Sequence, residues 1–142
     1  MQISARADYA VRACLVLATR LDSPMSAEAV AVNADVPAKF LEAILAELRN
    51  GGIVRTQRGP TGGCRLARPP DDITLLAIIE AVEGRLGDVR GLDPGALSYP
   101  ESAAALPQVW ARVQTLLRST LAATTLAALA HAETATVRVT DR

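Results

Sequence analysis

A chain of 142 residues is long enough for one domain, or for one small domain with an added interaction element. Half of the residues are apolar but only 3% are aromatic, which favours helices packed through small side chains over a β-sandwich. The formal net charge is zero, which argues against a general nucleic-acid binder. However, residues 1–70 hold nine basic and six acidic side chains, and residues 71–142 hold six and nine. This asymmetry fits a nucleic-acid-facing half joined to a half with another task.

The two cysteines, Cys14 and Cys64, lie in different predicted elements and do not form a disulfide framework. The first apolar run, Ala13–Ala18, is too short to span a membrane, and no secretory cleavage pattern follows it. We therefore expect a cytoplasmic protein in a reducing compartment, with no membrane partner.

The N-terminal part of the chain predicts two helices. Ser4 is suited to cap a helix over Ala5–Leu21, and Ser26 is suited to open a shorter helix that ends near Asn33. The residues of the first helix expected to be buried are Tyr9, Ala13, Val16, Leu17 and Leu21. Residues 33–36 then turn the chain into a third helix. Two short helices joined by such a turn are typical of a helix-turn-helix.

The third helix is expected over residues 37–50. Pro37 suits its first position, and Gly51 with Gly52 can end it. Its apolar stripe consists of Phe40, Leu41, Ile44, Leu45 and Leu48. A hairpin is expected over residues 53–68, with strands Ile53–Arg58 and Gly63–Arg68 joined by a glycine–proline turn. A hairpin directly after a helix-turn-helix indicates the wing of a winged helix-turn-helix.

Positive charge gathers in this helix and hairpin. Five arginines lie between Arg49 and Arg68 with no acidic residue among them, and the preceding helix exposes Lys39 and Glu42. The pattern suggests a DNA-reading unit whose helix enters the major groove and whose wing reaches the backbone or the minor groove. The charges alone leave a second interpretation open, a solvated basic hairpin on an ordinary domain.

A fourth helix is expected from Thr74, as its cap, to Gly84, with an apolar side formed by Leu75, Leu76, Ile78, Ile79 and Val82. Residues 1–84 would then form the winged domain. Glycines and prolines interrupt every candidate helix in residues 85–105, which predicts a long loop that links the two parts or binds an effector.

Pro107 begins the last major helix, expected within residues 106–132. Its apolar stripe consists of Val109, Trp110, Val113, Leu116, Leu117 and Leu121. Because the winged domain already has its own core, we interpret this stripe as a dimer surface. The alternative is that it packs on its own core. Residues 133–142 are polar and are expected to form a flexible tail.

Three segments carry a family resemblance: ISARADYAVRACLVLA, then VPAKFLEAILAELRNGGIVRTQRGPTGGCRLARPPDDITLLAIIEAVEG, and late in the chain VWARVQTLLRSTLAATTLAALA. Together they closely resemble the IscR/NsrR/CymR (Rrf) family of bacterial transcriptional regulators. The resemblance covers residues 1–131, with the 85–105 loop as the divergent part. It implies a mainly helical protein with a small β-hairpin wing and a long C-terminal dimerisation helix, acting as a homodimer on a palindromic promoter site.

The resemblance also places individual residues at the DNA. Lys39, Phe40 and Glu42 fall at the start of the recognition helix, where a glutamate can accept a hydrogen bond from a cytosine amino group. Phe40 also belongs to the apolar stripe, which favours a place in the core. Arg58 falls at the wing tip, where the family has a DNA-contacting arginine. The full predicted DNA-binding set, which includes two residues where the family's N-terminus meets phosphate, is Ser4, Arg6, Ala38, Lys39, Phe40, Glu42, Arg49, Arg58, Thr61 and Arg65.

The sequence departs from the family in two places. Iron–sulfur members carry three cysteines in the loop before the dimerisation helix, whereas residues 85–105 hold neither cysteine nor histidine. Cluster ligation needs such groups, so we expect no iron–sulfur cluster and no metal site. The second departure is Cys64, where many relatives have the tyrosine of a GGY sequence. Nearby arginines could lower its pKa and make it a redox switch. The alternative is a small residue tolerated on the hairpin face.

Other functional classes have less support. Nothing suggests an enzyme, because the chain lacks paired carboxylates in a plausible pocket, a Ser–His–Asp set and a GxxxxGK loop. A winged module that binds proteins and has lost DNA binding stays open, because the net charge is neutral. We interpret the chain as a homodimeric DNA-binding regulator, a repressor, that binds double-stranded promoter DNA. A small-molecule effector of unknown identity is a possible partner.

Overall fold

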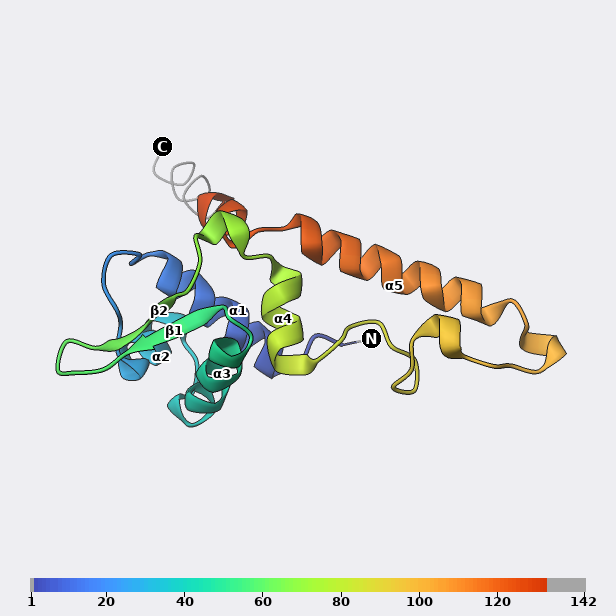
Figure 1. The fold of residues 1–142 in the computed structure, drawn as a ribbon, viewed down its shortest axis with the longest axis horizontal. Coiled ribbons are helices and arrows are strands. Elements are labelled where there is room, and N and C mark those ends of the chain that lie inside the picture. Colours follow the sequence, from blue (N-terminus) through green and yellow to red (C-terminus); the bar gives the residue numbers. More distant parts are fainter. Residues whose placement is uncertain (1, 133–142) are drawn as a thin grey trace.

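Helices and one short hairpin build the chain over residues 2–132, the part that the computed structural model describes (Figure 1). The helices are α1 (Ala5–Ala18), α2 (Ala27–Ala34), α3 (Ala38–Asn50), α4 (Leu75–Glu83) and α5 (Leu106–Ala123), and the strands are β1 (Val54–Gln57) and β2 (Gly63–Leu66). Short 3₁₀ turns lie at Pro70–Asp72, Pro94–Ala96 and Glu101–Ala103. The prediction of a mainly helical fold with a small hairpin and a long C-terminal helix is confirmed.

Side-chain caps start the first two helices as predicted. The hydroxyl of Ser4 accepts a hydrogen bond from the backbone N–H of Ala7 at 3.0 Å, and that of Ser26 accepts from Ala29 at 3.2 Å. Helix α1 ends at Ala18, earlier than predicted, where both the backbone N–H and the hydroxyl of Thr19 donate to the Val16 carbonyl, at 3.1 and 2.6 Å. Leu21, expected to be buried, is therefore exposed beyond the helix. Pro37 is the N-cap of α3, one position before its predicted place.

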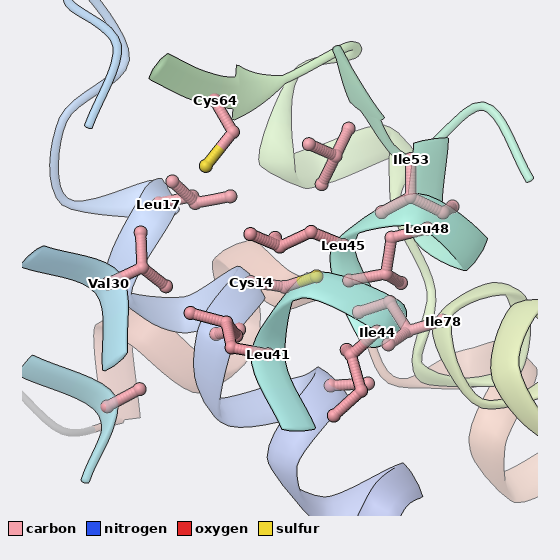
Figure 2. Close-up of a cluster of buried hydrophobic side chains, with 14 of the residues drawn as sticks. Cys14, Leu17, Val30, Leu41, Ile44, Leu45, Leu48, Ile53, Cys64 and Ile78 are labelled. Carbon is pink, nitrogen blue, oxygen red and sulfur yellow. The ribbon is translucent and has the colours of Figure 1, made fainter. Parts of the chain in front are cut away.

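The core lies where α1 crosses α3 and α4, and Figure 2 shows its centre around Cys14, Leu41, Ile44, Leu48 and Ile78. Helix α1 contributes mostly small side chains: Ala7, Ala10, Ala13, Cys14 and Leu17. The expectation that small side chains pack the helices is therefore correct, but some of the residues of α1 that are buried differ from those predicted. Tyr9 and Val16, predicted to be buried, are only half-buried at the edge of the cluster.

The hairpin is anchored by the segment that precedes α2. Strands β1 and β2 pair antiparallel, and Cys64 in β2 also exchanges backbone hydrogen bonds of 2.9 and 2.8 Å with Met25. Gly63 has a φ of 149°, and a Cβ on it would collide with the Met25 carbonyl. Only glycine allows this close approach, so the hairpin can lie against the helical core.

The C-terminal region leaves the winged domain and then returns to it. Helix α5 extends away from the domain, with the 85–105 segment alongside (Figure 1). It ends at Ala123, and residues 126–132 form a separate helical segment. Leu126 is fully buried in the winged-domain core, and its N–H donates to the Ile73 carbonyl at 2.9 Å. The predicted tail, 133–142, lies outside the described residues. Within residues 2–132, no helix is long and apolar enough to cross a membrane.

Candidate nucleic-acid interface

Helix α3 divides into a buried side and an exposed side. Leu41, Ile44, Leu45 and Leu48 pack into the core as predicted. Outside this buried stripe, five of the predicted DNA-binding residues are exposed: Ala38, Lys39, Phe40, Glu42 and Arg49. Four of these residues lie in the first two turns of α3, directly after the turn of the helix-turn-helix, and Arg49 lies near its C-terminal end.

Phe40 is not a core residue, which corrects the expectation from the apolar stripe. Its side chain is 45% exposed. At about 100° per residue, its direction lies roughly 90° from the centre of the stripe formed by the four buried residues. The ring instead stacks on Tyr9 of α1, with centroids 6.0 Å apart, and the Lys39 ammonium lies 4.9 Å from the ring centroid.

The hairpin presents a basic outer face. Arg55 and Arg65 are direct cross-strand partners, so their side chains lie on the same face of the two-stranded sheet. With Thr56 and Gln57 they line a shallow concavity of about 310 Å³. Arg58 and Thr61 are exposed at the turn, as a wing tip requires. The hairpin projects to one side of the domain and α5 to the other (Figure 1).

This positive charge has little internal compensation. Within residues 2–132, no ion pair involves Arg49, Arg55, Arg58 or Arg65. Two like charges directly opposite each other on a sheet destabilise it by roughly 0.2–1 kcal/mol. A hairpin that keeps this arrangement is suited to bind an anion, and a row of phosphates supplies the matching charge.

The two N-terminal residues predicted at phosphate have partners inside the chain. Ser4, besides capping α1, donates its hydroxyl hydrogen to a carboxylate oxygen of Glu83. Arg6 pairs with Glu47 on α3. Arg6 thus lies at α3, where its guanidinium is paired with Glu47. A contact between Arg6 and phosphate stays a prediction.

Two residues that support α3 were missed by the sequence reasoning. The Arg12 Nε donates to the carbonyl of Ala34 at 3.0 Å, and another guanidinium nitrogen donates to the carbonyl of Asp35. Asp35 adopts a left-handed φ of 53° at the end of α2. Arg12 also lies over the ring of Tyr9, 5.2 Å from its centroid. Arg12 therefore holds the turn that leads into α3, and Tyr9 links Arg12 to Phe40; nothing in their local pattern indicated these contacts.

Cys64 does not have the environment that a redox switch needs. Its side chain is buried on the inner face of the hairpin, with Sγ donating to the Met25 carbonyl at 3.3 Å. Burial raises the pKa of the Cys64 thiol, which is opposite to the lowering expected from nearby arginines. Arg65, the next residue in the strand, points to the other face because side chains alternate. The alternative interpretation, a small residue packed on the hairpin, agrees with this position.

The 85–105 segment is held by polar contacts. Arg85 pairs with Asp93 at 2.5 Å and with Asp88 at 3.6 Å, and the Trp110 indole N–H donates to the Tyr99 hydroxyl at 3.2 Å. The residues do not fit an iron–sulfur cluster, because the segment offers no thiol or imidazole. Cys14 and Cys64 are buried in the winged domain. Among residues 2–132, no group of three or more His, Cys, Asp or Glu side chains is placed to hold a metal ion.

Helix α5 has no residue buried by the rest of the described chain. In its predicted stripe, Val109 is 49% exposed and Leu116 is 61% exposed. Trp110, Val113, Leu117 and Leu121 are half-buried. The part of the chain that the structure describes therefore covers only one side of an amphipathic helix.

Comparisons with known proteins agree with this geometry. A family model described as Rrf2, iron-dependent transcriptional regulator, matches residues 3–132. The protein Rv1287 of Mycobacterium tuberculosis (strain H37Rv), whose name describes a helix-turn-helix transcriptional regulator, is 38% identical over 131 residues, which cover 92% of this chain and 81% of that protein.

Solved structures are also similar. CymR of Bacillus subtilis superimposes with a TM-score of 0.77 at 30% identity, covering 92% of this chain and 97% of that chain. IscR of T. potens does so with a TM-score of 0.72 at 30% identity, covering 91% and 85%. These similarities extend over both the winged domain and α5.

Proposed function

The chain belongs to the Rrf2 family of DNA-binding transcriptional regulators, and from this premise we propose that it acts as a homodimer on a palindromic promoter site. Each protomer would insert α3 into the major groove and place its wing against the adjacent backbone or minor groove. The observation that carries the proposal is that Arg55, Arg58 and Arg65 of the hairpin form no ion pair within residues 2–132 and follow directly after α3, whose start is exposed. This positive charge complements a phosphate backbone.

A second copy of the chain is the partner that suits α5. On this 18-residue helix Val109 and Leu116 are exposed and the rest of the apolar stripe is only half-buried, so a symmetric pair of such helices would bury both stripes at once. A twofold axis through α5 would place two wings on one duplex, which is the arrangement that a palindrome requires. Bound at a promoter, the dimer would block transcription, so repression is the proposed output, and the cytoplasm is its proposed compartment.

We propose that the regulator works without an iron–sulfur cluster, because the 85–105 segment offers no cluster ligands. A small effector at this segment is a further part of the proposal, and its identity is open. The absorbance spectrum and the iron content of protein purified without oxygen test the first point. A colourless, iron-free dimer that binds its promoter supports it, and stoichiometric iron and sulfide would refute it.

DNA binding itself is tested by titrating the full chain against a duplex from its own promoter region at several salt concentrations. We expect the logarithm of affinity to fall linearly with the logarithm of salt concentration, by about 0.9 for each phosphate contacted. A transcription assay on the same duplex tests repression. No binding even at low salt would favour the alternative, a winged module that binds proteins.

A further inference from the structure

Phe40 is held in place without being buried. The rings of Tyr9 and Phe40 are inclined by 29° in their stack, with the Arg12 guanidinium over the Tyr9 ring and the Lys39 ammonium over the Phe40 ring. We call these four side chains the α1–α3 stack. Ring stacking and cation–π contacts of this kind restrict a side chain that solvent would otherwise leave mobile.

The stack is anchored at the other end by the helix-turn-helix turn itself. Besides its bonds to the carbonyls of Ala34 and Asp35, the Arg12 guanidinium pairs with Asp8 at 3.0 Å. Arg12 is therefore rigid, Tyr9 lies against Arg12, and Phe40 lies against Tyr9. The turn that sets the direction of α3 thus also sets the position of the Phe40 ring.

The surface near the ring combines apolar and charged side chains. A concavity of about 670 Å³ opens beside Tyr9 at the start of α3, and Val32, Pro37 and Ala38 line it together with Arg12 and Asp35. Val32 is 79% exposed although it lies in a helix next to the core. The Phe40 ring is 45% exposed at the start of α3, and DNA offers one apolar feature in the major groove, the 5-methyl group of thymine.

We propose that Phe40 is a specificity-determining residue that contacts the 5-methyl group of a thymine in each half-site. The proposal rests on the proposed function, and it names one residue of the DNA-binding surface and the base that this residue recognises. Phe40 cannot donate or accept a hydrogen bond, so a contact to a base edge must be apolar. Lys39 lies over the ring, and its ammonium would bind a neighbouring phosphate. That contact would position the DNA against the ring without contributing to base recognition.

The decisive probe removes the methyl group and nothing else. The full chain is titrated against its promoter duplex, or a duplex selected from random sequence, in which each thymine in turn is replaced by deoxyuridine. We expect one thymine in each half-site to be sensitive, with affinity falling about fourfold, as for one buried methyl group. Replacing both symmetric thymines should cost about fifteenfold.

Two variants assign the effect to Phe40. In Phe40→Ala the deoxyuridine penalty should disappear, while Lys39→Ala should bind all duplexes more weakly and keep the penalty. Circular dichroism of both variants confirms that α3 is intact. If no deoxyuridine replacement changes the affinity of the wild type, the assignment to Phe40 is overturned, and the proposed regulator function is unaffected. A penalty that persists in Phe40→Ala would move the contact to another residue, and no binding to any duplex would refute both proposals.

Discussion

Arg55 and Arg65 lie opposite each other across the hairpin, on the face that points away from the core, and neither has a carboxylate partner within residues 2–132. Their mutual repulsion should lower the stability of the free protein, while both charges favour DNA. We expect Arg65→Gln to raise the free energy of unfolding by about 0.2–1 kcal/mol. The same variant should reduce the salt slope of DNA binding by about 1.

Chemical denaturation and salt-dependent binding of the same preparation measure both effects. Arg90→Gln, in the 85–105 segment, is the matched control and should leave the salt slope unchanged. A loss of stability in Arg65→Gln would mean that the two arginines do not repel each other in the free protein.

Arg58 is exposed at the hairpin turn, ahead of a glycine with a φ of 109°. If its guanidinium enters the minor groove or reaches a phosphate, Arg58→Ala should weaken promoter binding by roughly 1–3 kcal/mol without changing stability. Gel-shift titration gives the affinity and thermal unfolding gives the stability. Unchanged affinity would remove Arg58 from the interface.

Leu116 is the most exposed of the large apolar residues on α5. A glutamate there would place a charge in the proposed dimer surface, so Leu116→Glu should shift the protein from dimer to monomer in analytical ultracentrifugation. Thr115→Glu adds the same charge on a neighbouring helix direction, about 100° away, and should remain dimeric. A dimeric Leu116→Glu variant would place the interface elsewhere.

Both cysteines should resist modification in the folded protein. Burial raises the pKa of Cys14 from 9.0 to about 12, and it raises the pKa of Cys64 as well. Because both pKa values lie above the unfolded ones, burial of the neutral thiols contributes stability that is complete below pH 9 and is lost as the pH rises toward 12.

Alkylation by iodoacetamide should therefore be slow at pH 8 for the native protein and fast after denaturation. Mild peroxide should leave the affinity for the promoter unchanged. Rapid labelling of native Cys64, located by mass spectrometry, would restore the redox switch as a hypothesis.

Leu126 connects the C-terminal segment to the winged-domain core. It is fully buried next to Ile73, whose carbonyl accepts its backbone N–H. Leu126→Ala should therefore cost about 2–5 kcal/mol of unfolding free energy. Ala128→Ser, at an exposed position in the same segment, is the control and should change stability by less than about 0.5 kcal/mol. A similarly small change in Leu126→Ala would mean that the segment is not part of the cooperative domain.

Local signals account for the parts of the fold that the sequence predicted well. Ser4, Ser26 and Thr74 cap the helices that were assigned to them, because a cap depends on residues only three positions away. The hairpin followed from the glycine–proline turn between two short strands, again a local pattern. The exposed positions of Lys39, Glu42 and Arg58 followed from the helical period and from the turn.

The tertiary structure decided what each of these elements faces. Phe40 is exposed and ordered because Tyr9, which lies 31 residues earlier in the chain, stacks on it. Cys64 is buried because the strand register and the Met25 bridge turn it toward the core, away from the arginines beside it in the sequence. Arg6 forms an ion pair with Glu47, and the backbone N–H of Leu126 donates to the carbonyl of Ile73. By itself the sequence determined the helices, the strands and the basic wing, because propensity and periodicity act over a few residues. The burial of side chains, the pKa values of the cysteines and the ion pairs depend on distant segments that only packing brings together.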